Sequence, residues 1–245
     1  MMKVRKKNLA LGVSCITLLF PMGMNAQNET NVSVGADVVS GYYWRGEDLG
    51  GVSVQPGLNI TKGNFALSAW GSVGIDAKDT KEFDLTAAYT IGKVNIGITD
   101  YSFNKTPGSS IANAKYFSYG AHSTTSSHVF EGNIGYNFGP FTVNWYTNFA
   151  GQDYYKKKDG TRAYSTYIEA AAPFKLGGLD MKAEMGCSPW DGAYTTATDK
   201  FAIVNIGLTA KKTVKVTDSF SFPVFAKVAV NPESQKAYMV LGISF

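Results

Sequence analysis

The residues that stand out chemically are charged side chains at alternate positions within otherwise apolar runs. Glu82 and Asp84 are separated by one residue, and so are Lys182 and Glu184. Because side chains two apart in a strand point to the same face, each pair would act on one surface. The residues expected on that surface are Asp37, Arg45, Glu82, Asp84, Glu131, Glu169, Lys182, Glu184 and Lys227. Acidic members outnumber basic ones, so the surface could favour cations, or its charges could neutralise one another in salt bridges.

Arg45 differs from the other members of this set because it falls where the first expected strand meets a loop. Glu82 and Asp84 are the carboxylates with which it could pair. A guanidinium group binds a carboxylate through two parallel hydrogen bonds, which fixes both distance and orientation. Such a pair would fix how two segments of the chain lie against each other. It would also adjust the selectivity of any pore that this surface lines.

Residues suited to catalysis are few. His122 and His128 are the only histidines, and their spacing does not match the His-x-x-x-His pattern of a metal site. A Gly-x-Ser-x-Gly nucleophile elbow is also absent. The sequence therefore predicts no catalytic, cofactor-binding or metal site, and we do not expect an enzyme.

The elements that must position these side chains are strands, since apolar and polar residues alternate with a period of two along nearly all of the chain. About twelve strands are expected, each close to the length that a tilted membrane strand needs. The connection 212–218 is expected to be an extended hairpin, and a count of ten or fourteen strands stays open. The expected strands are 32–44, 52–61, 64–75, 82–91, 94–103, 128–138, 141–150, 163–174, 179–188, 200–211, 219–230 and 237–245.

One row of each strand is apolar, as in Phe83, Leu85 and Ala87, and the other row is polar. A soluble β-sandwich would bury the apolar row, whereas a membrane barrel would turn it toward lipid, so alternation alone leaves both folds open. Aromatic residues near the strand ends would suit the interfacial girdles of a barrel. Those residues are Tyr42, Trp44, Tyr136 and Trp145.

The lengths of the connections favour the barrel. Short turns at 61–64, 92–93, 139–140 and 176–179 alternate with longer polar loops at 45–51, 76–81, 104–127, 151–162 and 189–199. Short periplasmic turns and long extracellular loops are typical of outer-membrane barrels. We therefore predict an all-β, antiparallel, up-and-down transmembrane barrel with both termini in the periplasm. The 104–127 loop is long enough to plug it.

The N-terminus indicates export. Basic residues at 3–7 precede a short apolar stretch, Leu9–Phe20, and a small residue at Ala26. This order is that of a secretory signal peptide, expected here over residues 1–26, followed by a barrel domain over 27–245. Without the four basic residues of the leader, the chain has nineteen basic and nineteen acidic residues. The net charge is then zero and gives no sign of nucleic-acid binding.

The final strand ends on an aromatic residue, Phe245. Met239, Leu241 and Ile243 form one apolar row with it, and this row is expected to face lipid and to lie against the first strand near Val34–Val38. A last strand that ends in phenylalanine resembles the closing strand of bacterial outer-membrane barrels, where it is the signal read by the barrel assembly machinery. The resemblance implies that role for Phe245.

The segment Ser40-Gly-Tyr-Tyr-Trp-Arg-Gly46 resembles the first-strand signature of the TorF-like porin family, Ser-x-Tyr-x-aromatic-Arg-Gly. Similar segments follow at 55–58, 64–75, 82–85 and 100–101, and Gly41 stands where the family often has a polar residue. The resemblance is clearest over 34–103. It implies an outer-membrane porin of a Gram-negative bacterium but identifies no substrate and no site.

Three functions remain open at this stage. The first is a pore for small solutes or ions embedded in outer-membrane lipid. The second is a non-conducting barrel that serves as a structural or partner subunit of an envelope complex. The third is an outer-membrane hydrolase, for which His122 and His128 would be the residues to test.

Overall fold

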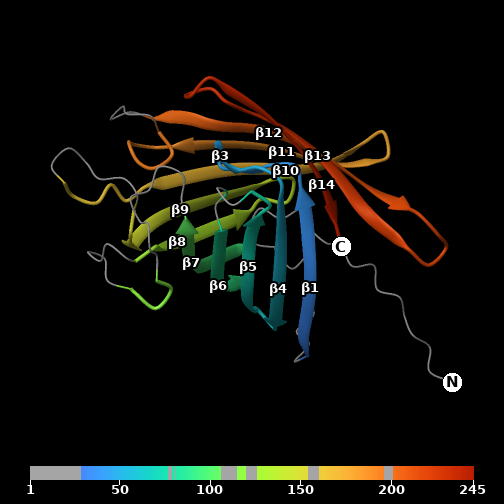
Figure 1. Ribbon diagram of the computed structural model, residues 1–245, viewed down its shortest axis with the longest axis horizontal. Helices are drawn as coiled ribbons and strands as arrows, with labels where there is room; N and C mark the ends of the chain where they lie inside the picture. Colours follow the sequence, from blue (N-terminus) through green and yellow to red (C-terminus); the bar gives the residue numbers. More distant parts are fainter. Residues whose placement is uncertain are drawn as a thin grey trace.

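The computed structural model describes residues 29–76, 79, 81–105, 115–119, 126–153, 160–195 and 201–245. Within them, twelve antiparallel strands close into a barrel, and each strand pairs with its neighbour in the chain (Figure 1). None of the described residues forms a helix long and apolar enough to cross a membrane. The expected leader, 1–26, and His122 lie outside the described residues.

All twelve expected strands are present and form the wall of the barrel, so the predicted fold and strand number are confirmed. β4 begins the consecutive hairpins that follow β1, and β14 returns to pair with β1 and closes the wall. The wall strands are β1 (Thr30–Val39), β4 (Ser53–Lys62), β5 (Phe65–Gly74), β6 (Lys81–Ile91), β7 (Val94–Lys105), β8 (His128–Asn137), β9 (Thr142–Gly151), β10 (Thr166–Leu176), β11 (Leu179–Ser188), β12 (Ala202–Lys215), β13 (Ser221–Asn231) and β14 (Lys236–Ser244).

The two faces of the wall differ as the alternation predicts. Outward side chains are apolar and exposed, with Val34 at 72% and Met239 at 67% relative accessibility. Inward side chains are polar and buried, such as Ser53 and Gln55, both at 2%. Soluble proteins rarely expose contiguous apolar patches larger than a few hundred Å². The apolar row thus lies outside the barrel, as lipid contact requires, and does not form the core of a sandwich.

Short turns gather at one end of the barrel, at 63–64, 92–93 and 177–178, together with the start of β1 and the end of β14. The opposite end carries the longer connections, together with the short turn 232–235 between β13 and β14. At the short-turn end, β12 and β13 continue past their neighbours to the pair Lys215 and Ser221. The predicted extended hairpin around 212–218 is therefore confirmed.

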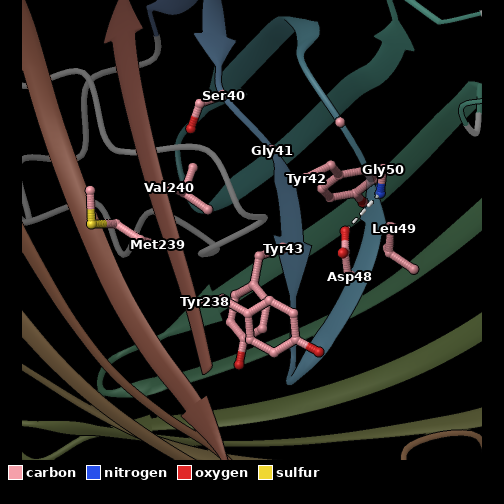
Figure 2. A pocket seen from close by; sticks show the side chains of 11 residues that line it. Ser40, Gly41, Tyr42, Tyr43, Asp48, Leu49, Gly50, Tyr238, Met239 and Val240 are labelled. Atoms are coloured by element: carbon pink, nitrogen blue, oxygen red, sulfur yellow. Dashed lines mark hydrogen bonds between the residues drawn. The ribbon is translucent and has the colours of Figure 1, made fainter. Parts of the chain in front are cut away.

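The expected first strand, 32–44, is wrong at its end. β1 stops at Val39, and the chain then forms a separate two-stranded hairpin of β2 (Tyr42–Trp44) and β3 (Glu47–Gly50), shown in Figure 2. Arg45 and Gly46 form its turn, with φ angles of 49° and 95°. Positive φ at both central residues is the geometry of a tight type I′ turn, which reverses the chain immediately. The segment 45–51 is therefore part of a hairpin and not an extended surface loop.

The position of this hairpin also corrects the expected aromatic girdle. Tyr136 and Trp145 lie on the outer face, at 41% and 40% relative accessibility. Tyr42 and Trp44 do not, because they belong to β2, whose side chains contact inward residues of the wall. Tyr42 binds Glu82, and the Trp44 ring lies 5.6 Å from that of Tyr101.

Candidate functional site

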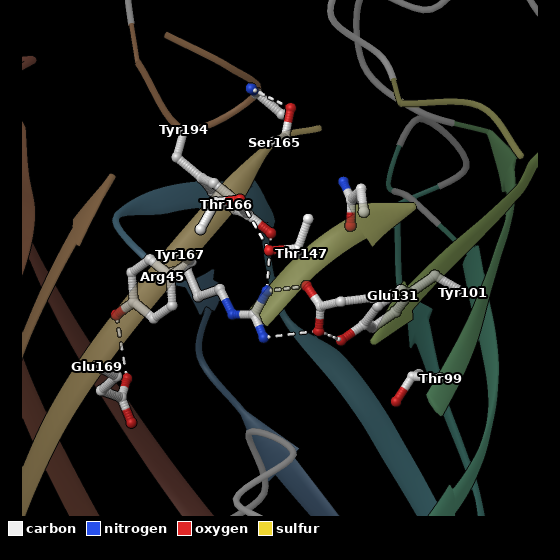
Figure 3. A network of polar contacts seen from close by, with 12 residues as sticks. Arg45, Thr99, Tyr101, Glu131, Thr147, Ser165, Thr166, Tyr167, Glu169 and Tyr194 are labelled. Carbon is white, nitrogen blue, oxygen red and sulfur yellow. Dashed lines mark hydrogen bonds and ion pairs between the residues drawn. The ribbon is translucent and has the colours of Figure 1, made fainter. Parts of the chain in front are cut away.

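The candidate site is the hairpin Tyr42–Gly50, called the inner hairpin below, together with the wall residues that it contacts. Arg45 at its tip forms a two-pronged ion pair with Glu131 of β8 (Figure 3). The two guanidinium nitrogens lie 2.5 Å and 3.0 Å from the two carboxylate oxygens. Tyr101 of β7 donates a further hydrogen bond of 2.9 Å to the same carboxylate. Glu131 thus accepts three hydrogen bonds inside the barrel.

Aromatic rings surround the Arg45 guanidinium on its other sides. Its central carbon lies 4.0 Å from the ring centre of Tyr146, 4.3 Å from Trp44 and 4.9 Å from Tyr167. A cation over an aromatic face is attracted by the ring quadrupole, more strongly when both are desolvated. Arg45 keeps 7% of its surface accessible, so these rings and Glu131 replace water as its surroundings.

Tyr194 completes the cage from the connection between β11 and β12. Its hydroxyl oxygen accepts a hydrogen bond of 2.7 Å from Arg45. Burial raises the pKa of Tyr194 well above its usual range, although the Arg45 charge lowers it. The phenol therefore keeps its proton and contacts Arg45 as a neutral group.

The tip of the inner hairpin also contacts the wall at β12 and β13. Asn231 of β13 donates a 3.0 Å hydrogen bond to the carbonyl oxygen of Gly46, and Tyr43 donates one of 3.0 Å to Asn205 of β12. A Cβ atom on Gly46 would lie 2.1 Å from the carbonyl oxygen of Val204. Only glycine fits there, and the hairpin spans the interior from β8 to β13.

The expected pairing of Arg45 with Glu82 or Asp84 is wrong. The hairpin carries Arg45 to β8, whereas both acids lie on β6. Only the base of the hairpin reaches β6, where Tyr42 donates a 2.8 Å hydrogen bond to Glu82.

A second charge cluster centres on Glu184 of β11. Lys227 of β13 and Lys182 approach its two carboxylate oxygens at 2.5 Å and 2.7 Å. Asn205 donates a further hydrogen bond of 3.0 Å. With two cations beside one carboxylate, this part of the interior carries no excess of negative charge.

Glu82 and Asp84 form a third group, which differs from the other two. Among the described residues, neither takes part in an ion pair with lysine or arginine. Both Asp84 oxygens are buried, and the carboxyl group interacts with that of Glu82, whereas Ser72 Oγ and Trp70 Nε1 on the neighbouring strand β5 are buried without a hydrogen-bond partner. Unpaired polar atoms gathered in one place are suited to contact water or a cation.

The remaining expected residues also lie inside the barrel. Asp37 of β1 is buried at 4% relative accessibility, between Gln55 and Ser244 of the adjacent strands. Glu169 of β10 is half-buried and accepts a 3.0 Å hydrogen bond from Tyr167. All nine charged residues thus share one enclosed surface, but the structure divides them among separate clusters.

Several residues of the site were not anticipated from the sequence. Lys211 is on the inward row of β12 and lies close enough to Asp37 for their charges to interact. Lys211 is separated from Asn205 and Thr209 by an even number of residues, and both of these are buried and polar. This spacing could have placed Lys211 on the inward face from the sequence. The aromatic cage gave no such signal, because its members come from four distant parts of the chain. They are Trp44, Tyr146, Tyr167 and Tyr194.

His128 lies on the outer face of β8 and not in the lumen. Its Nδ1 atom is 2.8 Å from Asp100, and its Nε2 atom contacts the carbonyl oxygen of Tyr116. The described piece Lys115–Tyr119 of the 104–127 loop therefore lies against the outside of the wall. With both nitrogens held by acceptors, His128 is not placed to activate a serine as a general base.

Comparison with known proteins gives the following. No family model matches the chain, and no curated protein matches it. A chain from a study of the in-meso crystallization of membrane proteins aligns with 89% of this chain and 83% of its own length, at 10% identity and a TM-score of 0.43. A refined porin aligns with 79% of this chain and 61% of its own length, at 15% identity and a TM-score of 0.35. The fold described above rests on the strand pairing of this chain alone.

Proposed function

We propose that this protein is an outer-membrane channel for small cations or other small solutes, closed by the inner hairpin. The observation that carries the proposal is the enclosed charged surface of a twelve-stranded barrel whose outer face is apolar. Charges in a membrane protein are costly unless they face a polar interior. The hairpin that crosses this interior is held by hydrogen bonds, an ion pair and ring contacts, all of which are reversible.

The orientation that we propose places the short turns and both ends of the chain in the periplasm. Cleavage of the leader near Ala26 would leave the mature N-terminus on that side, and the long connections would face outward. Insertion would require recognition of the closing strand, with Phe245, by the barrel assembly machinery. The TorF-like signature, expected in the first strand, lies after β1 at Ser40–Gly46 and forms the start of the inner hairpin.

The proposed preference for cations rests on the acidic groups that no described lysine or arginine pairs with. Glu131 and Glu184 are each neutralised by a neighbouring cation. Glu82 and Asp84 are not, and rings or pairs of acidic side chains select cations in channels. These two residues are therefore the proposed determinants of selectivity.

The test is conductance in planar bilayers under a potassium chloride gradient, with the reversal potential as the measure of selectivity. We expect a cation preference that weakens in the variant with Glu82→Gln and Asp84→Asn. Asp180→Asn is the matched control, because it removes a carboxylate from the exposed start of β11 and should leave the reversal potential unchanged. A double variant with the selectivity of the native protein would overturn the assignment of these two residues.

A second candidate function is favoured by the fullness of the interior. A barrel whose lumen is crossed by a hairpin could be a non-conducting scaffold in an envelope complex. That function predicts stable co-purification of another envelope protein in mild detergent and no conductance in any variant. A hydrolase, the third possibility, receives no support from the placement of His128.

A further inference from the structure

The seam between β1 and β14 is much shorter than the other joints of the wall. β1 pairs with β4 along its whole length, from Thr30 to Val39. With β14 it pairs only over Asp37–Val39, flanked by backbone bonds from Ala36 to Phe245 and from Ser40 to Leu241. The ladder ends at Ser40, where the chain turns inward.

The first part of β14, before Leu241, is left uncovered on the edge that faces β1. Leu241 and Phe245 direct their backbone groups toward β1, and Ser40 Oγ takes the place of a carbonyl by accepting the N–H of Leu241 at 2.9 Å. By the alternation of an antiparallel ladder, Met239 and Ala237 direct their backbone groups to the same side. Among the described residues no strand pairs with that side of Met239 or Ala237. The wall therefore has a lateral opening here.

A cavity of about 480 Å³ lies directly behind the opening. Figure 2 shows its lining: Ser40 and Gly41 after β1, the base of the inner hairpin and the open edge of β14. The Tyr43 and Tyr238 rings pack against each other, with centres 4.4 Å apart, beside Leu49. This volume lies within the range of about 300–1,000 Å³ that is usual for small-molecule sites.

The opening lies at the depth of the apolar outer surface. Met239 on one side of it is 67% accessible, and Val52 and Val73 on the other side are 42% and 50% accessible. Unpaired backbone groups facing hydrocarbon are costly, which is why barrels normally close along their full length. An occupant that enters from the bilayer would cover this edge.

We propose that the opening admits the alkyl chain of a single-chain amphiphile from the membrane into this cavity. Tyr43, Leu49 and Tyr238 supply apolar surface for an alkyl chain, and the polar part of the lining suits the head group. Among the described residues, Asp48 is the one charged residue of the lining, and no described lysine or arginine contributes to it. An uncharged or cationic head group is therefore accepted in preference to an anionic one. An extended peptide added to β14 is the competing occupant, and the cross-linking test below separates it from a lipid.

The test uses photoactivatable probes in vesicles that contain the full-length protein. A monoacylglycerol with a diazirine in its chain should label peptides from Tyr42–Gly50 and from Lys236–Leu241. A diazirine fatty acid of the same chain length should label them several-fold less. Gly41→Phe should reduce the labelling by the monoacylglycerol at least several-fold, since Gly41 has an ordinary φ and its Cβ would meet only the Gly50 carbonyl oxygen at 3.7 Å.

Gly132→Phe is the matched control, because it adds the same ring to the outer face of β8, where its Cβ would meet Phe149 at 3.6 Å. It should leave labelling at the cavity unchanged. If Gly41→Phe does not assemble, Leu49→Trp fills the same cavity from the other arm of the hairpin. Labelling spread evenly over the outer wall, labelling unaffected by either filling variant, or cross-links between β14 and a peptide instead of the lipid probe would overturn the proposal. None of these readouts depends on conduction through the lumen.

Discussion

Arg45 is the residue on which the inner hairpin depends most. A desolvated guanidinium is costly unless it is paired, hydrogen-bonded and well packed. Here Glu131 supplies the charge, Tyr194 a further acceptor, and Tyr146 and Trp44 supply ring faces. These partners come from separate strands and loops, so the side chain ties the hairpin to several parts of the wall at once.

Removing either partner of the Arg45–Glu131 pair should leave the other charge buried and alone. We expect Arg45→Ala and Glu131→Ala each to lower the free energy of unfolding by about 3–5 kcal/mol. The double variant should lose clearly less than the sum, because it leaves no unpaired charge. Urea unfolding from lipid vesicles measures all three, and strictly additive losses would show that the two side chains do not act together. The free energy of unfolding of Arg45→Lys should lie between those of the native protein and Arg45→Ala, since lysine keeps the charge but not the two-pronged hydrogen bonding.

Glu47, next to the hairpin turn and outside the twelve wall strands, should make the hairpin sensitive to pH. Burial raises its pKa from 4.5 to about 7, although the Arg45 charge lowers it. The inserted hairpin therefore binds this proton more tightly than a released, solvated one. Its insertion should be most stable below about pH 4.5 and weaken as the pH rises to about 7.

Open probability in planar bilayers, measured across that range, checks this expectation. The native protein should open more often as the pH rises, with little further change above about pH 7. Glu47→Gln should remove the dependence. A Glu47→Gln variant with the same pH profile as the native protein would assign the effect to another group.

At the scale of elements, the turn of the inner hairpin sets its reach. Gly46→Val should displace the tip from β12, because φ is 95° and the new Cβ would collide with the Val204 carbonyl. The expected result is a higher conductance than that of the native protein in planar bilayers. Gly63→Val is the matched control: φ there is 57°, but no atom lies within 4 Å of the new Cβ. Equal conductance in both variants would mean that the contact with β12 does not hold the hairpin.

The closing strand gives a separate prediction about assembly. Phe245 exchanges two backbone hydrogen bonds with Ala36, of 2.9 Å and 3.2 Å, and its ring lies 6.2 Å from that of Phe222. Deleting Phe245 removes part of an already short seam and should lower the amount of folded barrel in the outer membrane. Phe245→Ala keeps the backbone bonds and separates their effect from that of the ring. Normal insertion of the deletion variant would contradict the role of this terminus.

The wall was predictable because side chains alternate between two faces of a strand. Each strand can therefore face in only two ways, and the wrong one would turn every apolar side chain inward. The site was less predictable. Tyr42–Gly50 follows β1 after two residues, and the alternation of side chains does not say whether such a segment extends the wall or folds into the barrel. The turn at Arg45–Gly46 is the one local signal. The partner of Arg45, Glu131, is 86 residues away, a separation that alternation does not encode.

At the scale of the whole molecule, the barrel combines a paired wall with one hairpin that lies inside it. The other wall strands are joined by longer ladders, some with a bulge, and the seam of β1 and β14 is the shortest. The inner hairpin is covalently joined to that same region through Ser40 and Val52. Displacement of the hairpin therefore requires no rearrangement of the other wall strands, as expected of a plug in an otherwise rigid barrel.

The most direct measurement is the single-channel conductance of a variant in which Tyr42–Gly50 is replaced by a short glycine–serine linker. This change removes the hairpin and leaves all twelve wall strands in place. The account predicts that the native protein conducts little and that the variant shows a large, steady, cation-preferring conductance. A variant that is folded in the bilayer but conducts no more than the native protein would contradict it.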